Sequence, residues 1–204
     1  MIRNIVFDIG NVIWEKTPKI ILKDIDIDEE MKRIIKKNIF DNPLWIKLDM
    51  GIYNLDSYFE VIRDTLPANI HDIAKEILTE LYKNRKFNNE IIELIRKLDK
   101  KYNIYILSDN NIDYYEYLKT TELNKYIDGW CVSAMYNEIK KDKKLFEIFF
   151  EKYKLKPEEC YFIDDKISNV EIGKSFGMNG FVLDWEENTF YDLIYDMRKN
   201  NIEI

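Results

Sequence analysis

The chain has 204 residues, of which 46% are hydrophobic and 34% charged, with only 6 glycines and 4 prolines. These proportions exclude a disordered, collagen-like or low-complexity protein, and the length allows one large domain or one domain with an inserted piece. The net charge is −7, with basic residues spread among acidic ones. Because nucleic-acid-binding proteins usually carry a basic face, this balance argues against nucleic acid as the main partner.

The chain begins with an apolar run over residues 4–10 that predicts a buried strand. About 90 residues separate this run from the next predicted strand, far more than one crossover helix needs. The segment 15–86 carries several stretches with helical periodicity, punctuated by Pro43 and Pro67. We therefore predict an all-helical insertion over residues 15–86.

The remaining residues, 87–204, alternate between strands and helices. After a helical stripe that begins near Asn89, four further apolar runs predict strands at 102–109, 128–134, 159–165 and 180–185. Helical segments follow them at about 112–124, 143–154, 168–176 and 189–199. This alternation predicts an α/β fold, with a Rossmann-like parallel five-stranded sheet in a core made of residues 1–14 and 87–204.

Cys131 and Cys160 lie inside apolar stretches, which predicts buried free thiols in a reducing compartment. His71 is the single histidine, so a histidine-based zinc site lacks ligands. No charged and then apolar leader precedes the first strand, and no apolar run approaches the ~20 residues that span a bilayer. We expect a cytoplasmic protein without a membrane partner.

Polar residues end three of the predicted strands. Asp8 ends the first strand, Ser108 and Asp109 end the second, and Asp164 and Asp165 end the fourth. Because ligands gather at the carboxyl ends of the strands in an open α/β sheet, these groups are expected to converge at one edge. Several carboxylates at one point repel one another and need a cation, and oxygen ligands favour Mg²⁺.

The same edge is predicted to bind phosphate. The Ser108 hydroxyl and a lysine from the run at 140–144 supply a hydrogen-bond donor and a fixed positive charge. The turn at Gly10 and Asn11 can point backbone N–H groups at phosphoryl oxygens, since glycine permits unusual dihedrals. Asp8 is then in place for in-line attack on phosphorus, which gives an aspartyl-phosphate that water hydrolyses.

Four motifs in this order, VFDIGNV, ILSDN, IKKDKKLF and FIDDKISN, resemble those of the haloacid dehalogenase-like (HAD) superfamily over the whole chain. The resemblance implies an α/β core with a helical cap inserted between the first and second motifs. It also implies a Mg²⁺-dependent phosphatase acting on a small phosphorylated metabolite. Among the branches of the family, the motifs and the cap stretch LDMGIYNLDSYFE are most similar to bacterial phosphatases of α-glucose 1-phosphate.

By this resemblance, Asp8 is the nucleophile and a magnesium ligand. The Gly10 carbonyl and Asp165 are the implied further ligands, while Asp164 and Asn169 support the metal site from beside or behind. Ser108 is implied to bind the phosphoryl group.

The third family motif reads Lys-Pro-Asp-Pro-x-Ile-Phe. Aligning its end with Leu145 and Phe146 places the catalytic, phosphate-binding lysine at Lys140 and leaves Lys141 where proline usually stands. Which of the two lysines contacts phosphate stays open at this stage.

Two positions depart from the family pattern. Gly10 stands where most phosphatases of the superfamily carry an aspartate that works as general acid and base, although the glucose-1-phosphate branch also has glycine there. Without such a group, rates typically fall by ~10²–10⁴, and a leaving group of low pKa is least affected. Glu15 is a candidate substitute, with a surface role as its alternative. Asp109 replaces the asparagine usual in the branch and is counted among the predicted phosphate-binding residues, although an extra carboxylate there would disfavour a phosphate dianion.

Two other functions compete with the phosphatase. One is a catalytically impaired binding or regulatory protein that keeps the fold, which the glycine at position 10 motivates. The other is a carbon–halogen hydrolase, whose relatives also lack the second acid but use a cleft arginine. Four aromatic residues of the insertion either line the substrate cleft or pack inside the insertion: Trp45, Tyr53, Tyr58 and Phe59.

Overall fold

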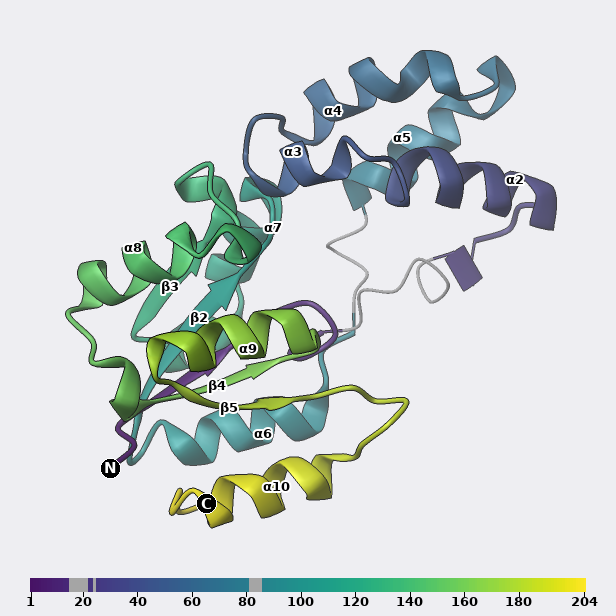
Figure 1. Cartoon of the computed structure of the whole chain (residues 1–204). Coiled ribbons are helices and arrows are strands. Elements are labelled where there is room, and N and C mark those ends of the chain that lie inside the picture. The colour runs from purple at the N-terminus through teal and green to yellow at the C-terminus, as the bar shows by residue number, and fades with distance from the viewer. Residues whose placement is uncertain (15–21, 24, 81–85) are drawn as a thin grey trace.

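The structure, a computed structural model, describes residues 1–14, 22–23, 25–80 and 86–204 (Figure 1). Five strands form one sheet in the order β3-β2-β1-β4-β5, and every neighbouring pair is parallel. The fold is therefore the predicted α/β class with a Rossmann-like parallel sheet. The strands are β1 (Asn4–Phe7), β2 (Asn103–Ser108), β3 (Gly129–Val132), β4 (Cys160–Asp164) and β5 (Asn179–Val182).

Helices cover both faces of the sheet (Figure 1). Successive residues of β1 point to opposite faces, because Ile5 and Phe7 join one buried cluster and Val6 joins another. The first cluster includes residues of α6 and α10, and the second includes residues of α8. This double burial explains why the strand sequences are continuously apolar. The helices of this part are α6 (Asn89–Leu98), α7 (Ile112–Thr120), α8 (Lys144–Tyr153), α9 (Ile167–Phe176) and α10 (Phe190–Lys199).

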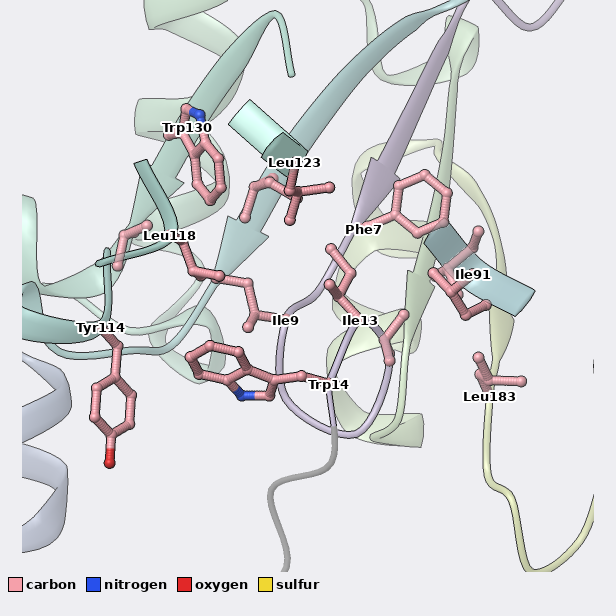
Figure 2. Close-up of a cluster of buried hydrophobic side chains, with 14 of the residues drawn as sticks. Phe7, Ile9, Ile13, Trp14, Ile91, Tyr114, Leu118, Leu123, Trp130 and Leu183 are labelled. Carbon is pink, nitrogen blue, oxygen red and sulfur yellow. The ribbon is translucent and has the colours of Figure 1, made fainter. Parts of the chain in front are cut away.

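The loop after β1 folds back on itself instead of continuing the strand to residue 10. The Ile9 carbonyl accepts hydrogen bonds from the N–H groups of Ile13 and Trp14, at 2.9 and 3.1 Å. The three side chains are buried in a hydrophobic cluster that includes Tyr114 of α7, whose ring lies 5.8 Å from that of Trp14 (Figure 2). The apolar residues after Asp8 therefore anchor the loop that carries this carboxylate.

Among the described residues, four α-helices form a group to one side of the sheet, here called the helical group (Figure 1). They are α2 (Glu29–Ile35), α3 (Trp45–Asp49), α4 (Leu55–Ile62) and α5 (His71–Glu80). The predicted insertion 15–86 contains this group, while its residues 15–21, 24 and 81–85 lie outside the described residues. Glu15, the candidate substitute acid, lies outside them as well.

The helical group has packing of its own. Tyr58 is fully buried, donates its hydroxyl to the Ile39 carbonyl at 2.6 Å, and meets the ring of Trp45 edge-on. Phe59 is buried too, whereas Trp45 and Tyr53 are half-buried. Of the four aromatic residues considered from the sequence, Tyr58 and Phe59 therefore contribute to the interior of the group.

Asparagine side chains begin three of the helices. Asn54, Asn88 and Asn111 each accept a hydrogen bond from a backbone N–H in the first turn, at α4, α6 and α7 respectively. Such caps satisfy N–H groups that the helix itself leaves unpaired.

No helix in the described part of the chain is both long and apolar enough to cross a membrane.

The two cysteines are free and buried, and burial raises the pKa of each thiol to about 12. An ordinary thiol titrates near pH 8.5, so at pH 8 the thiolate fraction falls from about one quarter to about 10⁻⁴. We expect no reaction of Cys131 or Cys160 with a thiol-specific reagent in the native protein. Both are expected to react within minutes in 6 M guanidinium chloride, the control that establishes full reactivity. Rapid modification of the native protein at pH 8 would contradict this.

Candidate active site

Asp8 lies at the centre of the sheet edge where the strands end. β1 is the middle strand, and its last residue, Phe7, is in register with Ile106 of β2 and Ile163 of β4. The Asp8 N–H donates to the Ile163 carbonyl at 2.8 Å, which fixes the backbone from which the carboxylate projects. Ser108 at the end of β2 and Asp164 at the end of β4 flank this position, as the parallel topology predicts.

Lys140 brings a positive charge to this edge. Its ammonium donates to Asp8 Oδ1 at 2.7 Å and to Asp164 Oδ2 at 2.5 Å. The lysine is 1% exposed, whereas Lys141 is exposed to solvent. Of the two lysines left open by the sequence, Lys140 is the one at the carboxylates.

The carboxylates keep Lys140 protonated. Burial by itself lowers the pKa of a lysine, but the charges of Asp164, Asp8 and Asp109 outweigh it and raise the Lys140 pKa above its usual value. Burial also raises the pKa of Asp164, to about 6, against the opposing attraction of Lys140. The site therefore holds a fixed cation between two acidic groups at neutral pH.

Asp164 is held on both oxygens. The Asn169 amide donates to Oδ1 and Oδ2 at 3.0 Å each, and the Lys166 backbone N–H donates to Oδ1 at 2.8 Å. With Lys140 on Oδ2 as well, Asp164 is saturated with donors. This arrangement fits a carboxylate that orients the lysine and the following loop, and it leaves direct metal coordination to its neighbour Asp165.

Asp165 has one oxygen held and lies close to Asp8. Its Oδ2 accepts from the Asn11 amide at 2.9 Å, and burial together with the Asp8 charge raises its pKa. Oxygens of Asp8, Asp164 and Asp165 lie within 4.8 Å of one another. Crowded carboxylates of this kind fit a hard divalent cation such as Mg²⁺, which would relieve their repulsion. The Gly10 carbonyl accepts no hydrogen bond from the described residues and is available as a further oxygen ligand.

Three hydrogen-bond donors beside these acids have no acceptor among the described residues. Among the described residues, the N–H groups of Ile9 and Gly10 make no hydrogen bond, and the buried hydroxyl of Ser108 has none either. Such unsatisfied buried donors are costly unless a ligand accepts from them. Asn11 is used differently from the prediction for its turn, because its N–H donates to the Trp14 carbonyl at 2.8 Å and its amide holds Asp165.

Sequence reasoning did not single out Asn110 and Asn111. Both are fully buried after Ser108, and each side-chain nitrogen lacks a partner within the described part of the chain. Each side-chain oxygen is used locally, since Asn110 accepts from the Asn111 N–H and Asn111 caps α7. The signal present in the sequence was the run SDNN, but its burial is a property of the fold.

The Asp109 carboxylate points at the backbone of the lysine loop. Its Oδ1 accepts the Lys140 N–H at 2.9 Å, so the extra acid positions the segment from which Lys140 projects. We expect Asp109→Ala to lower kcat about 10- to 100-fold, because a shift of about 1 Å in a reacting group has effects of this size. Asp109→Asn keeps an oxygen acceptor and is expected to stay within about threefold of the unmodified protein. Steady-state phosphate release from both variants is the measurement, and equal losses would contradict a positioning role.

The helical group contacts the sheet edge through backbone carbonyls. The Ser133 hydroxyl donates to the Asp49 carbonyl at 2.5 Å, and the Asn137 amide donates to the Met50 carbonyl at 2.7 Å. Gly51 has φ +70° and lies against Ala134, where an added Cβ would be 2.5 Å from the Ala134 oxygen. The close approach and the left-handed backbone both require glycine here.

The sequence pattern of the haloacid dehalogenase-like hydrolases matches residues 2–177. With the parallel sheet and the acid–lysine cluster at its carboxyl edge, the chain belongs to the haloacid dehalogenase-like hydrolase family.

The chain is similar to known proteins in sequence or in fold. D-ribitol-5-phosphate phosphatase from Bacteroides thetaiotaomicron is 29% identical over 199 residues, covering 89% of this chain and 91% of that protein. A HAD family enzyme from the same organism, solved in complex with magnesium and inorganic phosphate, superposes with a TM-score of 0.72 at 18% identity, covering 95% of this chain and 99% of that one. L-2-haloacid dehalogenase from Xanthobacter autotrophicus superposes with a TM-score of 0.67 at 16% identity, covering 100% of this chain and 85% of that one.

Proposed function

We propose that this protein is a Mg²⁺-dependent phosphatase of a small phosphorylated metabolite that works through a phosphorylated Asp8. The observation that carries the proposal is the position of Asp8 at the middle strand's end, with the Lys140 ammonium at 2.7 Å and the Asp165 carboxylate beside it. A nucleophilic carboxylate, a buried cation and a pair of acidic metal ligands are the parts that phosphoryl transfer needs.

In the first step, an Asp8 oxygen attacks phosphorus, the bond from phosphorus to the substrate oxygen breaks, and the phosphoryl group remains on Asp8. The Ser108 hydroxyl and the free N–H groups of Ile9 and Gly10 are the donors for the phosphoryl oxygens. Lys140 pairs with Asp8 and balances the negative charge that gathers around it. A magnesium ion held by Asp8, Asp165 and the Gly10 carbonyl would neutralise phosphate charge.

In the second step, a water molecule attacks phosphorus, which releases inorganic phosphate and regenerates the Asp8 carboxylate. Gly10 offers no side chain to protonate the leaving oxygen or to activate this water. The rate is therefore expected to depend strongly on the pKa of the leaving alcohol.

Two substrate classes have support of different kinds. The relative named D-ribitol-5-phosphate phosphatase supports a sugar-alcohol phosphate. The glycine at position 10 supports a leaving group of low pKa, such as the anomeric oxygen of a sugar 1-phosphate. In either case the helical group, docked on the sheet edge through Asp49 and Met50, is proposed to act as the cap that covers the substrate and excludes water.

The test is phosphate release from a panel of D-ribitol 5-phosphate, α-D-glucose 1-phosphate, D-glucose 6-phosphate and p-nitrophenyl phosphate, with Mg²⁺ and with a chelator. We expect Mg²⁺-dependent turnover, and mass spectrometry of a rapidly quenched reaction should find one phosphoryl group on the peptide that contains Asp8. Mg²⁺ binding without turnover on any phosphate ester would favour the binding or regulatory alternative.

The dehalogenase alternative requires an arginine in the cleft, and within the described part of the chain the recorded partners of the arginines lie away from Asp8. Arg33 and Arg96 pair with glutamates three residues away on their own helices, and Arg3 pairs with Glu159. Arg63 contacts His71 within the helical group, and Arg85 lies outside the described residues. Halide release from a 2-haloacid that continues in the presence of a chelator would favour this alternative instead.

A further inference from the structure

Asn11 uses all three of its polar groups to connect separate parts of the site. Its N–H donates to the Trp14 carbonyl at 2.8 Å, its side-chain amide donates to Asp165 Oδ2 at 2.9 Å, and its carbonyl accepts from the Trp185 indole at 2.7 Å. Its φ is +57°, a left-handed conformation that asparagine tolerates better than most residues. A residue in this conformation keeps it only if its surroundings hold it.

Trp185 reaches this loop from the connection between β5 and α10, 174 residues away. The connection is bonded to itself and to the sheet. The Leu183 N–H donates to the Asp164 carbonyl at 2.9 Å, the Asp184 carboxylate accepts the Glu186 N–H at 3.0 Å, and the Asn188 amide donates to the Val182 carbonyl at 3.1 Å. The indole therefore projects from a turn that is held in place by its own hydrogen bonds.

The indole makes this bond although it is not buried. Trp185 is 39% exposed, so packing alone does not fix its ring, and its N–H has solvent as an alternative partner. The bond to the Asn11 carbonyl fixes the peptide plane between Asn11 and Val12. With that plane fixed, the left-handed turn of Asn11 is fixed, and with it the direction of the amide toward Asp165.

We propose that Trp185 is a positioning residue for the magnesium site, acting through Asn11 on Asp165 and on the adjacent Gly10 carbonyl. This inference rests on the proposed function, because it concerns the same ligands. Asp165 has Oδ2 held by Asn11, which leaves Oδ1 to face the ion. The bond from Trp185 to Asn11 and the bond from Asn11 to Asp165 therefore orient the Asp165 carboxylate before the ion binds. Less conformational freedom is then lost when the ion binds.

The variant that tests this is Trp185→Phe, which keeps an aromatic ring and removes the N–H donor together with the smaller ring of the indole. Titration of the substrate-free protein with MgCl₂ in a calorimeter is expected to show a dissociation constant about 3- to 10-fold higher than for the unmodified protein, the size of one lost hydrogen bond. At saturating Mg²⁺, kcat and the substrate KM are expected to return to within about twofold. Tyr191→Phe removes a polar atom from an exposed aromatic residue of α10 and is the matched control, expected to change nothing.

A double-mutant cycle tests the route through the asparagine. Asn11→Gly accepts the same left-handed backbone and keeps the carbonyl, but it removes the amide that holds Asp165. In that background, Trp185→Phe is expected to weaken Mg²⁺ binding by less than about twofold. A full 3- to 10-fold loss there would overturn the route through Asn11. Equal Mg²⁺ affinities of Trp185→Phe and the unmodified protein would overturn the positioning role alone, whereas no Mg²⁺ binding by the unmodified protein would overturn the proposed function.

Discussion

Asp8→Asn is expected to lower phosphatase turnover by at least ~10³-fold at saturating substrate and Mg²⁺, because an amide oxygen is a far weaker nucleophile than a carboxylate. The fold should persist, since asparagine has nearly the same shape and Lys140 keeps its partner Asp164 at 2.5 Å. Phosphate release on the most active substrate of the panel is the measurement, and no phosphoryl group should appear on the peptide that carries position 8.

The matched control is Asp142→Asn, which changes an exposed carboxylate in the lysine loop and should leave turnover unchanged. Turnover by Asp8→Asn within tenfold of the unmodified protein would contradict a covalent mechanism at this residue. Hydrolysis by direct attack of water would then be the better description.

Lys140→Met is expected to remove both activity and stability. The substitution keeps most of the aliphatic volume but leaves Asp8 and Asp164 facing each other in a buried site without their cation. Breaking such a buried pair by removing one partner typically costs about 3–5 kcal/mol of unfolding free energy. We expect turnover to fall by ~10²–10⁴ and the denaturation midpoint to fall at pH 7.5, as measured by phosphate release and by urea unfolding.

The pH dependence of this loss has a defined direction. Burial already raises the pKa of Asp164 to about 6 with the lysine present, and removing the lysine should raise it further. An acid whose folded pKa lies above its unfolded value destabilises the fold above the folded pKa, and this penalty fades as pH falls toward the ordinary value near 3.9. The stability gap between Lys140→Met and the unmodified protein should therefore narrow between pH 7 and pH 5. Lys141→Met, at an exposed position, is the control, and an equal effect of the two variants would contradict the assignment of Lys140.

The sheet was predictable because β1 to β4 are largely buried on both faces, and such strands appear in the sequence as continuous apolar runs. The ends of the strands were harder to predict. The run at residues 4–10 ends as a strand at Phe7, since the apolar residues after Asp8 are buried by a turn that is not an extension of the strand. Periodicity reports that a side chain is buried, but it does not distinguish burial in a strand from burial in a folded-back loop.

The convergence of acids at one edge followed from the topology alone, since parallel strands place their carboxyl ends together. The choice between Lys140 and Lys141 did not follow from the topology. The motif alignment placed the lysine at Lys140 but left Lys141 open, since four lysines in five positions form a run with little pattern of its own. In the structure, the Lys140 backbone is held by Asp109 and its ammonium by Asp8 and Asp164. The roles of these residues in binding and turnover remain predictions.

Contacts between distant loops were beyond the sequence. Trp185 was predicted to end a strand over residues 180–185, but β5 ends at Val182 and Trp185 lies in the turn after it. Its partner there is a backbone carbonyl, which has no sequence signature. The buried side-chain nitrogens of Asn110 and Asn111 were not predicted for a related reason, because asparagines in a run usually indicate an exposed turn. Both cases depend on which backbone groups the fold leaves unpaired.

The attachment of the helical group has a consequence for how this protein can change over time. Ser133 and Asn137 bind the carbonyls of Asp49 and Met50, and every amino acid has a carbonyl. The side chains of Asp49 and Met50 can therefore be exchanged while these two hydrogen bonds persist, whereas Gly51 must stay small. Substitutions at those two positions can accumulate without the contact between the helical group and the sheet edge having to be rebuilt.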